Sequence, residues 1–424
     1  MKFIYKLLSL SLAIACLSGC SAANTEIASS SAATATVTPT TDSTEVPASN
    51  NVFTSAGDGL YVTTDSGIYE LQTVFPASAN IFYTDANTKE RIFLCANPNC
   101  THADESCPSY IATPSAMFPP MLLRVGDQLL VVFTEATDSS NPHGMLMNMD
   151  GSNRRTVFEL ASNQYMQGGF CTSGNDLYFD LYEINDSGNV TYQLWYVSFE
   201  NGTSEKVMDL GSDSDHYSLC DGANNELCFN HVSSDGISYC MYNPQSKTIS
   251  DPFFVDSSVS GNSMIQDGYL FVLDEQASSV QRIRLSDKEQ ASASFTVKEG
   301  FGAPSMRYLF DGKLMITEAQ TTASDIPTDG SYGVCSYILD FGTRNCTEFT
   351  LQTPYNNRPV YVLTTIGDAC YVATDYKTYT PTSVSEDGTV SNFDYVANIY
   401  AFITKQDYIN SNQNGYSMVK DAFE

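Results

Sequence analysis

Apolar strands that follow polar turn residues recur along most of the chain. The turn pair Gly126-Asp127, for example, precedes the apolar run Leu129–Val131, and similar patterns begin at Gly57, Gly126, Gly174, Asn224, Asp267, Asp311 and Gly367. Successive starts lie 43 to 69 residues apart. Repeats of about 40–50 residues with four short strands each are typical of β-propeller blades. The pattern therefore predicts an all-β fold, a β-propeller of seven four-stranded blades, with six or eight blades as alternatives.

The unit around Gly174 illustrates the expected blade. Turn pairs that favour positive φ, Gly174-Asn175 and Asn201-Gly202, separate short apolar runs. We expect its four strands, from the innermost outwards, at Gln167–Ser173, Leu177–Glu183, Tyr192–Ser198 and Ser204–Leu210. Two β-sandwiches in tandem are the competing fold. The even spacing of the repeats over the whole body argues against them.

The first twenty residues have the layout of an export signal. Lys2 and Lys6 precede an apolar run over residues 7–17, which is too short to span a bilayer as a helix. The run ends in Leu17-Ser18-Gly19-Cys20, which resembles the lipobox of bacterial lipoproteins. That resemblance implies a signal peptide over residues 1–19 and lipidation of Cys20. An ordinary secretory signal with an incidental cysteine is the alternative.

Residues 20–50 are predicted to be a lipidated cysteine followed by a disordered tether. Of the 30 residues from 21 to 50, 20 are Ser, Thr or Ala and none is aromatic, so the segment cannot form a core. Residues 51–424 remain for the propeller. We therefore expect an extracytoplasmic protein that is anchored to the cell membrane by its lipid.

The charge of the chain limits its partners. It has 20 Lys and Arg against 49 Asp and Glu, a formal net charge of −29. Nucleic acid is therefore excluded as a partner, and anionic lipid cannot serve as a second anchor. The remaining candidates are a protein, a peptide or a glycan.

One segment is dense in metal-ligand side chains. Cys95, Cys100, His102 and Cys107 follow a C-x4-C-x-H-x4-C spacing, and three thiols with one imidazole match a closed tetrahedral zinc site. One disulfide with a free thiol is an equal alternative, and reduced, inert cysteines are a third. A metal here would be structural, since the protein would fill all four positions. No other cofactor is required.

The same segment carries a resemblance to a group of proteins. Leu94-Cys95, Cys100-Thr101-His102 and Cys107-Pro108, together with the lipobox and the tether, resemble uncharacterised lipoproteins of Gram-positive anaerobes that carry a TolB-like or related propeller. The resemblance implies the fold and the location. It implies no activity.

Other cysteines lie near predicted turns. Cys335 and Cys346 flank Asp340-Phe341 and could meet across a hairpin, while Cys228 and Cys240 flank another turn about one residue out of register. The favoured interpretation is that all of them are small buried apolar residues.

Signatures of catalysis are missing from the sequence. It has neither a G-x-S-x-G elbow nor an H-E-x-x-H motif. His216 and Arg307 fall on predicted innermost strands and are candidates to line the central channel. We therefore expect a binding or scaffold module for a protein, peptide or glycan at the cell surface. The alternative is a hydrolase or lyase that acts on extracellular polymers through carboxylates at the channel.

Overall fold

The computed structural model describes residues 53–55, 59–74, 78–113, 119–137, 139–256, 262–320, 333–379, 382–384, 390–392 and 395–421. These residues belong to one compact unit, Glu45–Glu424. The predicted signal peptide, Cys20 and the tether lie outside the described residues. Among the described residues, no helix has the length and apolar composition needed to cross a membrane.

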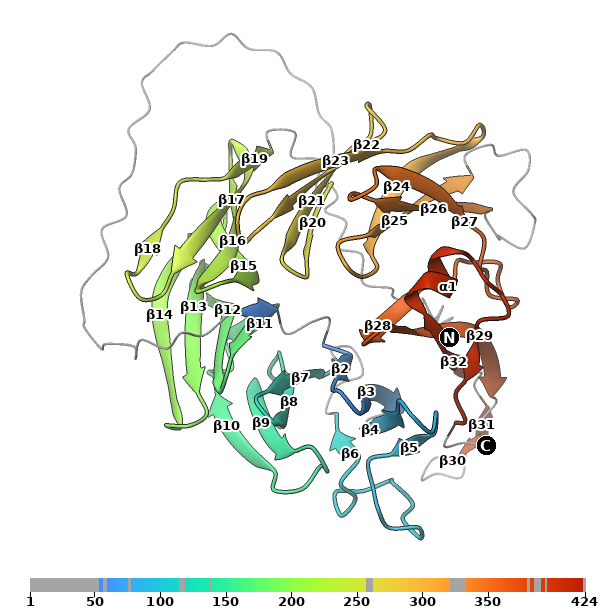
Figure 1. Ribbon diagram of the computed structural model, residues 1–424. Coiled ribbons are helices and arrows are strands. Elements are labelled where there is room, and N and C mark those ends of the chain that lie inside the picture. The colour runs from blue at the N-terminus through green and yellow to red at the C-terminus, as the bar shows by residue number, and fades with distance from the viewer. Residues whose placement is uncertain are drawn as a thin grey trace, which may run out of the picture. The chain divides into compact units, whose positions relative to one another are not determined.

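The unit consists of consecutive antiparallel sheets, as Figure 1 shows. The first sheet contains β2 (Tyr61–Thr63), β3 (Gly67–Val74), β4 (Ser78–Asp85) and β5 (Arg91–Phe93), with β6 (Tyr110–Ala112) paired to β4. The second contains β7 (Met121–Val125), β8 (Gln128–Phe133), β9 (His143–Asn148) and β10 (Arg155–Glu159).

A ten-stranded sheet follows in the chain. It contains β1 (Thr54–Ser55), β11 (Gln164–Ser173), β12 (Asp176–Ile184), β13 (Val190–Ser198), β14 (Thr203–Ser212), β15 (Asp215–Ala223), β16 (Glu226–Ser233), β17 (Gly236–Asn243), β18 (Thr248–Ile249) and β19 (Phe254–Asp256). Its first half reproduces the blade predicted around Gly174. The outer strand β14 bonds to the inner strand β15 of the next unit, because Gly211 and Ser212 pair with His216 and Asp215.

Three sheets complete the order along the chain. One contains β20 (Ser263–Gln266), β21 (Tyr269–Asp274), β22 (Ser279–Arg284) and β23 (Gln290–Ser294), and the next β24 (Phe301–Tyr308), β25 (Leu314–Gln320), β26 (Val334–Asp340) and β27 (Asn345–Phe349). The last contains β28 (Val362–Ile366), β29 (Ala369–Tyr379), β32 (Tyr395–Thr404) and β33 (Ser417–Met418). Between β29 and β32, the chain forms a two-stranded ribbon of β30 (Thr382–Val384) and β31 (Val390–Asn392). The helix α1 (Lys405–Ile409) follows β32 directly.

The hydrophobic cores lie between neighbouring sheets. Leu130 of β8 packs in one cluster with Phe179 of β12, and Met315 of β25 packs in another with Val372 of β29. A further cluster joins Ile68 of the first sheet to residues of the last sheet. Each sheet is thus buried on both faces by stacking, which is how propeller blades exclude water.

The first and last sheets also share polar contacts. The Thr63 and Thr364 hydroxyls lie 2.9 Å apart, and the Tyr400 hydroxyl donates to Glu70 at 2.5 Å. The sheets therefore close into a ring, and the fold is an all-β propeller. The expected number of seven blades stays a prediction, since two of the expected blades form one continuous sheet.

The turns predicted from the repeats mostly separate the first and second strands of a sheet. Gly126, Gly174 and Gly367, for example, adopt positive φ between such strands. The first repeat differs, because its apolar run includes β2, which is the first strand of its sheet rather than the second. The preceding strand β1 pairs instead with β11.

The proposed contact between Cys335 and Cys346 is wrong. The hairpin pairs Asp340 with Asn345, so Cys346 lies opposite Leu339 and Cys335 lies opposite Glu318 of β25. Cys228 and Cys240 are one residue out of register, as predicted, since Cys240 pairs with Phe229. Both are buried and reduced, which agrees with the apolar role favoured for them, and Cys335 is buried as well. Cys346 is exposed, so the expected burial is wrong for it.

Candidate functional site

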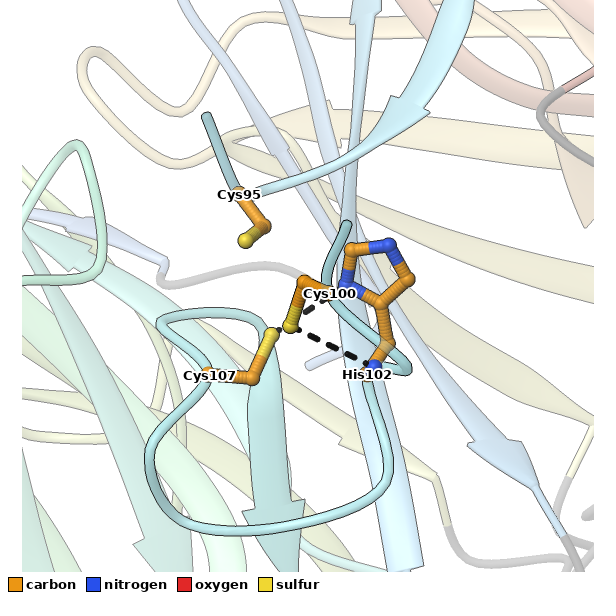
Figure 2. Close-up of side chains that lie close together, drawn as sticks. All are labelled: Cys95, Cys100, His102 and Cys107. Carbon is orange, nitrogen blue, oxygen red and sulfur yellow. Dashed lines mark hydrogen bonds between the residues drawn. The ribbon is translucent and has the colours of Figure 1, made fainter. Parts of the chain in front are cut away.

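The loop between β5 and β6 brings the four predicted metal-ligand side chains together (Figure 2). The sulfur atoms of Cys95, Cys100 and Cys107 and a ring nitrogen of His102 all lie within 4.8 Å of one another. Each of the ten cysteines in the described part of the chain is a free thiol. The four donors thus converge from one loop of 13 residues.

A left-handed residue turns the loop so that its donors face inwards. His102 has φ 54°, a conformation that costs a residue with a Cβ, and its backbone N–H donates to Sγ of Cys100 at 3.4 Å. Its ring stacks on Phe93 with centroids 4.0 Å apart, which fixes the orientation of the imidazole. As a result, Nδ1 of His102 lies 3.3 Å from Sγ of Cys107.

The surroundings of Cys107 favour its thiolate. Burial alone would raise the pKa of this thiol, but hydrogen bonds from Ser109, His102 and Cys100 outweigh burial and lower the pKa to about 6. The Ser109 hydroxyl lies 3.1 Å from the sulfur and 2.9 Å from Oδ1 of Asn80. A thiolate is the form of cysteine that binds a metal ion.

The donor set fits a closed tetrahedral site. With zinc–sulfur bonds of about 2.3 Å, ligand atoms lie roughly 3.8 Å apart, so the observed cluster needs only a small contraction. Four protein ligands leave no position for water or substrate. The cluster can therefore hold a structural ion, and it lacks the open position that metal catalysis requires.

The loop is also attached to the second sheet. Arg154, just before β10, donates from Nη1 to the carbonyl of Tyr110 at 2.7 Å and from Nη2 to the carbonyl of Pro108. Because Pro108 follows the last donor, Cys107, the position of the cluster is coupled to the packing of the first sheet on the second.

A cavity of about 430 Å³ lies among the first strands of four sheets. The strands β2, β20, β24 and β28 contribute to its wall, and the side chains include Tyr61, Met264, Asp267, Met306, Arg307 and Thr365. The wall thus combines apolar, aromatic and charged groups.

Arg307 is the cationic group of this wall. It is exposed, and its guanidinium carbon lies 4.3 Å above the ring of Tyr361. Within the described ranges, no carboxylate forms an ion pair with it. Burial raises the pKa of the Tyr361 hydroxyl, and the nearby charges of Arg307 and Arg358 counteract that rise in part.

Both carboxylates of the cavity wall have partners. Asp267 accepts a hydrogen bond from the Tyr308 hydroxyl. Asp311 forms an ion pair with Lys405, with Nζ 2.9 Å from Oδ1. The described residues that line the cavity include no cysteine, serine or histidine.

The two channel candidates from the sequence are not brought together. Arg307 lines the cavity, whereas His216 does not and instead stacks on Tyr192 of β13, with centroids 3.9 Å apart. Burial lowers the pKa of His216. No pattern in the sequence pointed to Tyr361, because its contact with Arg307 joins two different repeats.

Comparisons with known proteins find weak likenesses to solved structures. No family model matches the sequence, and no curated protein matches it. Among solved structures, the chain is similar to the tricorn protease, with 11% identity and a TM-score of 0.32 over 81% of this chain and 35% of that one. It is also similar to TolB from Acinetobacter baumannii, with 9% identity and a TM-score of 0.33 over 87% of this chain and 79% of that one.

A third similar structure is the β-propeller domain of the Trilobed protease from Pyrococcus furiosus. The identity is 12% and the TM-score 0.36, over 72% of this chain and 99% of that one. The chain spans about a third of the length of the tricorn protease. At such identities a likeness concerns the fold and not the activity.

Proposed function

We propose that this chain is a lipid-anchored extracytoplasmic module whose propeller binds a ligand in its central cavity. The anchor is inferred from Leu17-Ser18-Gly19-Cys20, and the stand-off from the membrane is inferred from the tether over residues 21–50. The ligand is a protein segment, a peptide or a glycan.

The cavity is the observation that carries the binding function. Its volume of about 430 Å³ lies within the range of small-molecule sites, about 300–1,000 Å³. Its wall presents both polar and apolar groups, and the polar groups can fix the orientation of a ligand. The first strands of four stacked sheets hold these groups on a rigid frame.

The two carboxylates of the cavity wall favour a binding function over a hydrolase or lyase reaction, because both have partners. A glycosidase-like mechanism needs one carboxylate as an acid and another as a base or nucleophile. Asp267 is held by Tyr308 and Asp311 by Lys405, so neither is free for that role. The enzyme alternative would gain support from turnover of a glycan or peptide.

Capture from the surface of the parent cell tests the binding function. The full chain serves as bait beside two variants, Thr365→Trp, which fills the cavity, and Thr347→Trp on the exposed outer strand β27. We expect wild type and Thr347→Trp to enrich the same partner and Thr365→Trp to lose it. The absence of any enriched partner, together with turnover of a glycan or peptide, would overturn the proposal.

We also propose that Cys95, Cys100, His102 and Cys107 bind one structural zinc ion. The convergence of four donors within 4.8 Å supports it. The coupling of this loop to Arg154 gives the ion a role, which is to brace the first sheet against the second.

Intact mass of the purified full chain, measured native and denatured without reductant or chelator, tests the zinc. We expect the native mass to be raised by one zinc and all thiols to be alkylated after denaturation. Cys100→Ser should lose the ion, and Cys346→Ser, at an exposed cysteine elsewhere, should keep it. A mass without metal, lowered by the hydrogens lost in a disulfide, would show that the loop is cross-linked instead.

A further inference from the structure

We infer that the cavity recognises a ligand with a single carboxylate, and that Arg307 binds that carboxylate. This inference rests on the proposed function, because it requires the cavity to be a ligand site. It adds the chemical class of the ligand and the residue that selects it.

The contact of Arg307 with the ring of Tyr361 orients its guanidinium so that it can bind a planar anion. The contact with Tyr361 at 4.3 Å occupies a face of the guanidinium, and the N–H donors lie in its plane. None of the ion pairs among the described residues takes up these donors. An oriented guanidinium with open edges is suited to two parallel hydrogen bonds to a carboxylate.

The charged groups of the cavity wall favour a ligand with one negative charge over a ligand with two. Asp267 and Asp311 lie on the same wall as Arg307, in a chain of net charge −29. Asp311 is paired with Lys405, so Asp267 is the carboxylate of this wall that would repel a dianion, such as a phosphate monoester, more strongly than a monoanion. A monocarboxylate gains the pairing with Arg307 with less repulsion.

Part of the wall can contact an apolar portion of a ligand. Met264, Met306 and Tyr61 offer thioether and aromatic surface beside Arg307. Methionine adapts to irregular apolar shapes, and the cavity has room for a phenyl ring with a short chain. The C-terminus of a short peptide has this chemistry, and so does a free organic acid, which would add to the ligand classes named in the proposed function.

Calorimetric titration of the full chain tests the inference. The probes are 3-phenylpropionate, its amide, phenyl phosphate, and the peptide Gly-Gly-Phe as acid and as C-terminal amide. We expect at least one of the two acids to bind about tenfold or more tightly than its own amide, because a charge-assisted pair is lost in the amide. The acid that binds identifies the source, free acid or chain terminus.

Variants of Arg307 test whether this residue binds the carboxylate of the ligand. Arg307→Gln should weaken binding of the acid about tenfold or more, and Arg307→Lys should weaken it less, because it keeps the charge and loses the planar fork. Arg155→Gln, at an exposed arginine on the outer strand β10, should bind as wild type.

Three results would overturn the inference. The first is that each acid binds with the same affinity as its amide, or that neither binds. The second is that phenyl phosphate binds more tightly than the acids. The third is that Arg307→Gln binds the acid with the affinity of wild type. The first comparison uses only wild type, so a folding defect of a variant cannot obscure it. If one of these three results is found while Thr365→Trp still abolishes capture of a surface partner, the inference has failed and the proposed function stands.

Discussion

At the scale of the residue, single buried carboxylates connect neighbouring units of the fold. Asp180 of β12 is 1% exposed and accepts the backbone N–H of Leu219 on β15 at 3.1 Å. Asp221 of β15 likewise accepts the N–H of Gly268, in the turn before β21, at 2.9 Å. At these two places, one unit is thus tied to the next by a side chain that the stacking of the sheets desolvates.

Asp180 makes stability depend on pH. Burial raises its pKa to about 7, so between roughly pH 4 and pH 7 the folded chain binds a proton that the unfolded chain has released. This contribution to stability is therefore lost as the pH rises. Asp180→Asn should raise the free energy of unfolding at pH 8, by at most about 4 kcal/mol, and by less at pH 5.

Urea unfolding at the two pH values measures this difference. Asp186→Asn, at an exposed carboxylate after β12, is the control and should change little at either pH. Equal effects of Asp180→Asn at pH 5 and pH 8 would show that Asp180 does not titrate between them.

Residue types could be predicted better than residue contacts. The sequence placed Arg307 on an innermost strand, and it lines the cavity. Its partner Tyr361 could not be predicted, since 54 residues and a change of sheet separate the two. The same limit applies to His216, whose stacking on Tyr192 depends on how β14 turns into β15.

At the scale of the element, the strands could be predicted and their exact register could not. Periodic turns and apolar runs located β11 to β14 within a few residues. The pairing of Cys346 with Leu339 differs from the prediction because the tight turn after Asp340 shifts the centre of the hairpin. Register depends on turn geometry, which residue spacing alone does not determine.

The metal-ligand loop should need its ion to stay ordered. It has no strand between β5 and β6, so the four donors provide much of its cross-linking. Chelation should therefore make residues 95–107 sensitive to limited proteolysis, with the cut sites read by mass spectrometry. Cys100→Ser should be cut without chelator and Cys346→Ser should not. Cutting that chelation leaves unchanged would show that no ion holds the loop.

At the scale of the whole molecule, a buried ion network closes the ring. Arg91 is 1% exposed, and its Nη2 lies 2.9 Å from Glu70 and its Nη1 3.2 Å from Asp421. The guanidinium also lies 3.8 Å above the ring of Phe82. Arg91 and Asp421 are 330 residues apart, so no local pattern could have predicted this contact.

Removal of Arg91 should weaken the closed ring strongly. Arg91→Ala leaves Glu70 buried without its cation, which typically costs about 3–5 kcal/mol. Arg155→Ala, at an exposed arginine, should change the free energy of unfolding by no more than about 0.5 kcal/mol. Urea unfolding followed by tyrosine fluorescence measures both. Equal midpoints for the two variants would mean that the network does not stabilise the closure.

The central claim is that ligand binds in the cavity among the first strands. Hydrogen exchange of the full chain, with and without a saturating captured ligand, tests it most directly. We predict slower exchange at residues 264–267, 306–311 and 362–365, with no change on the outer strands β10, β14 and β27. Protection confined to those outer strands, with unchanged exchange in the three cavity segments, would contradict the claim.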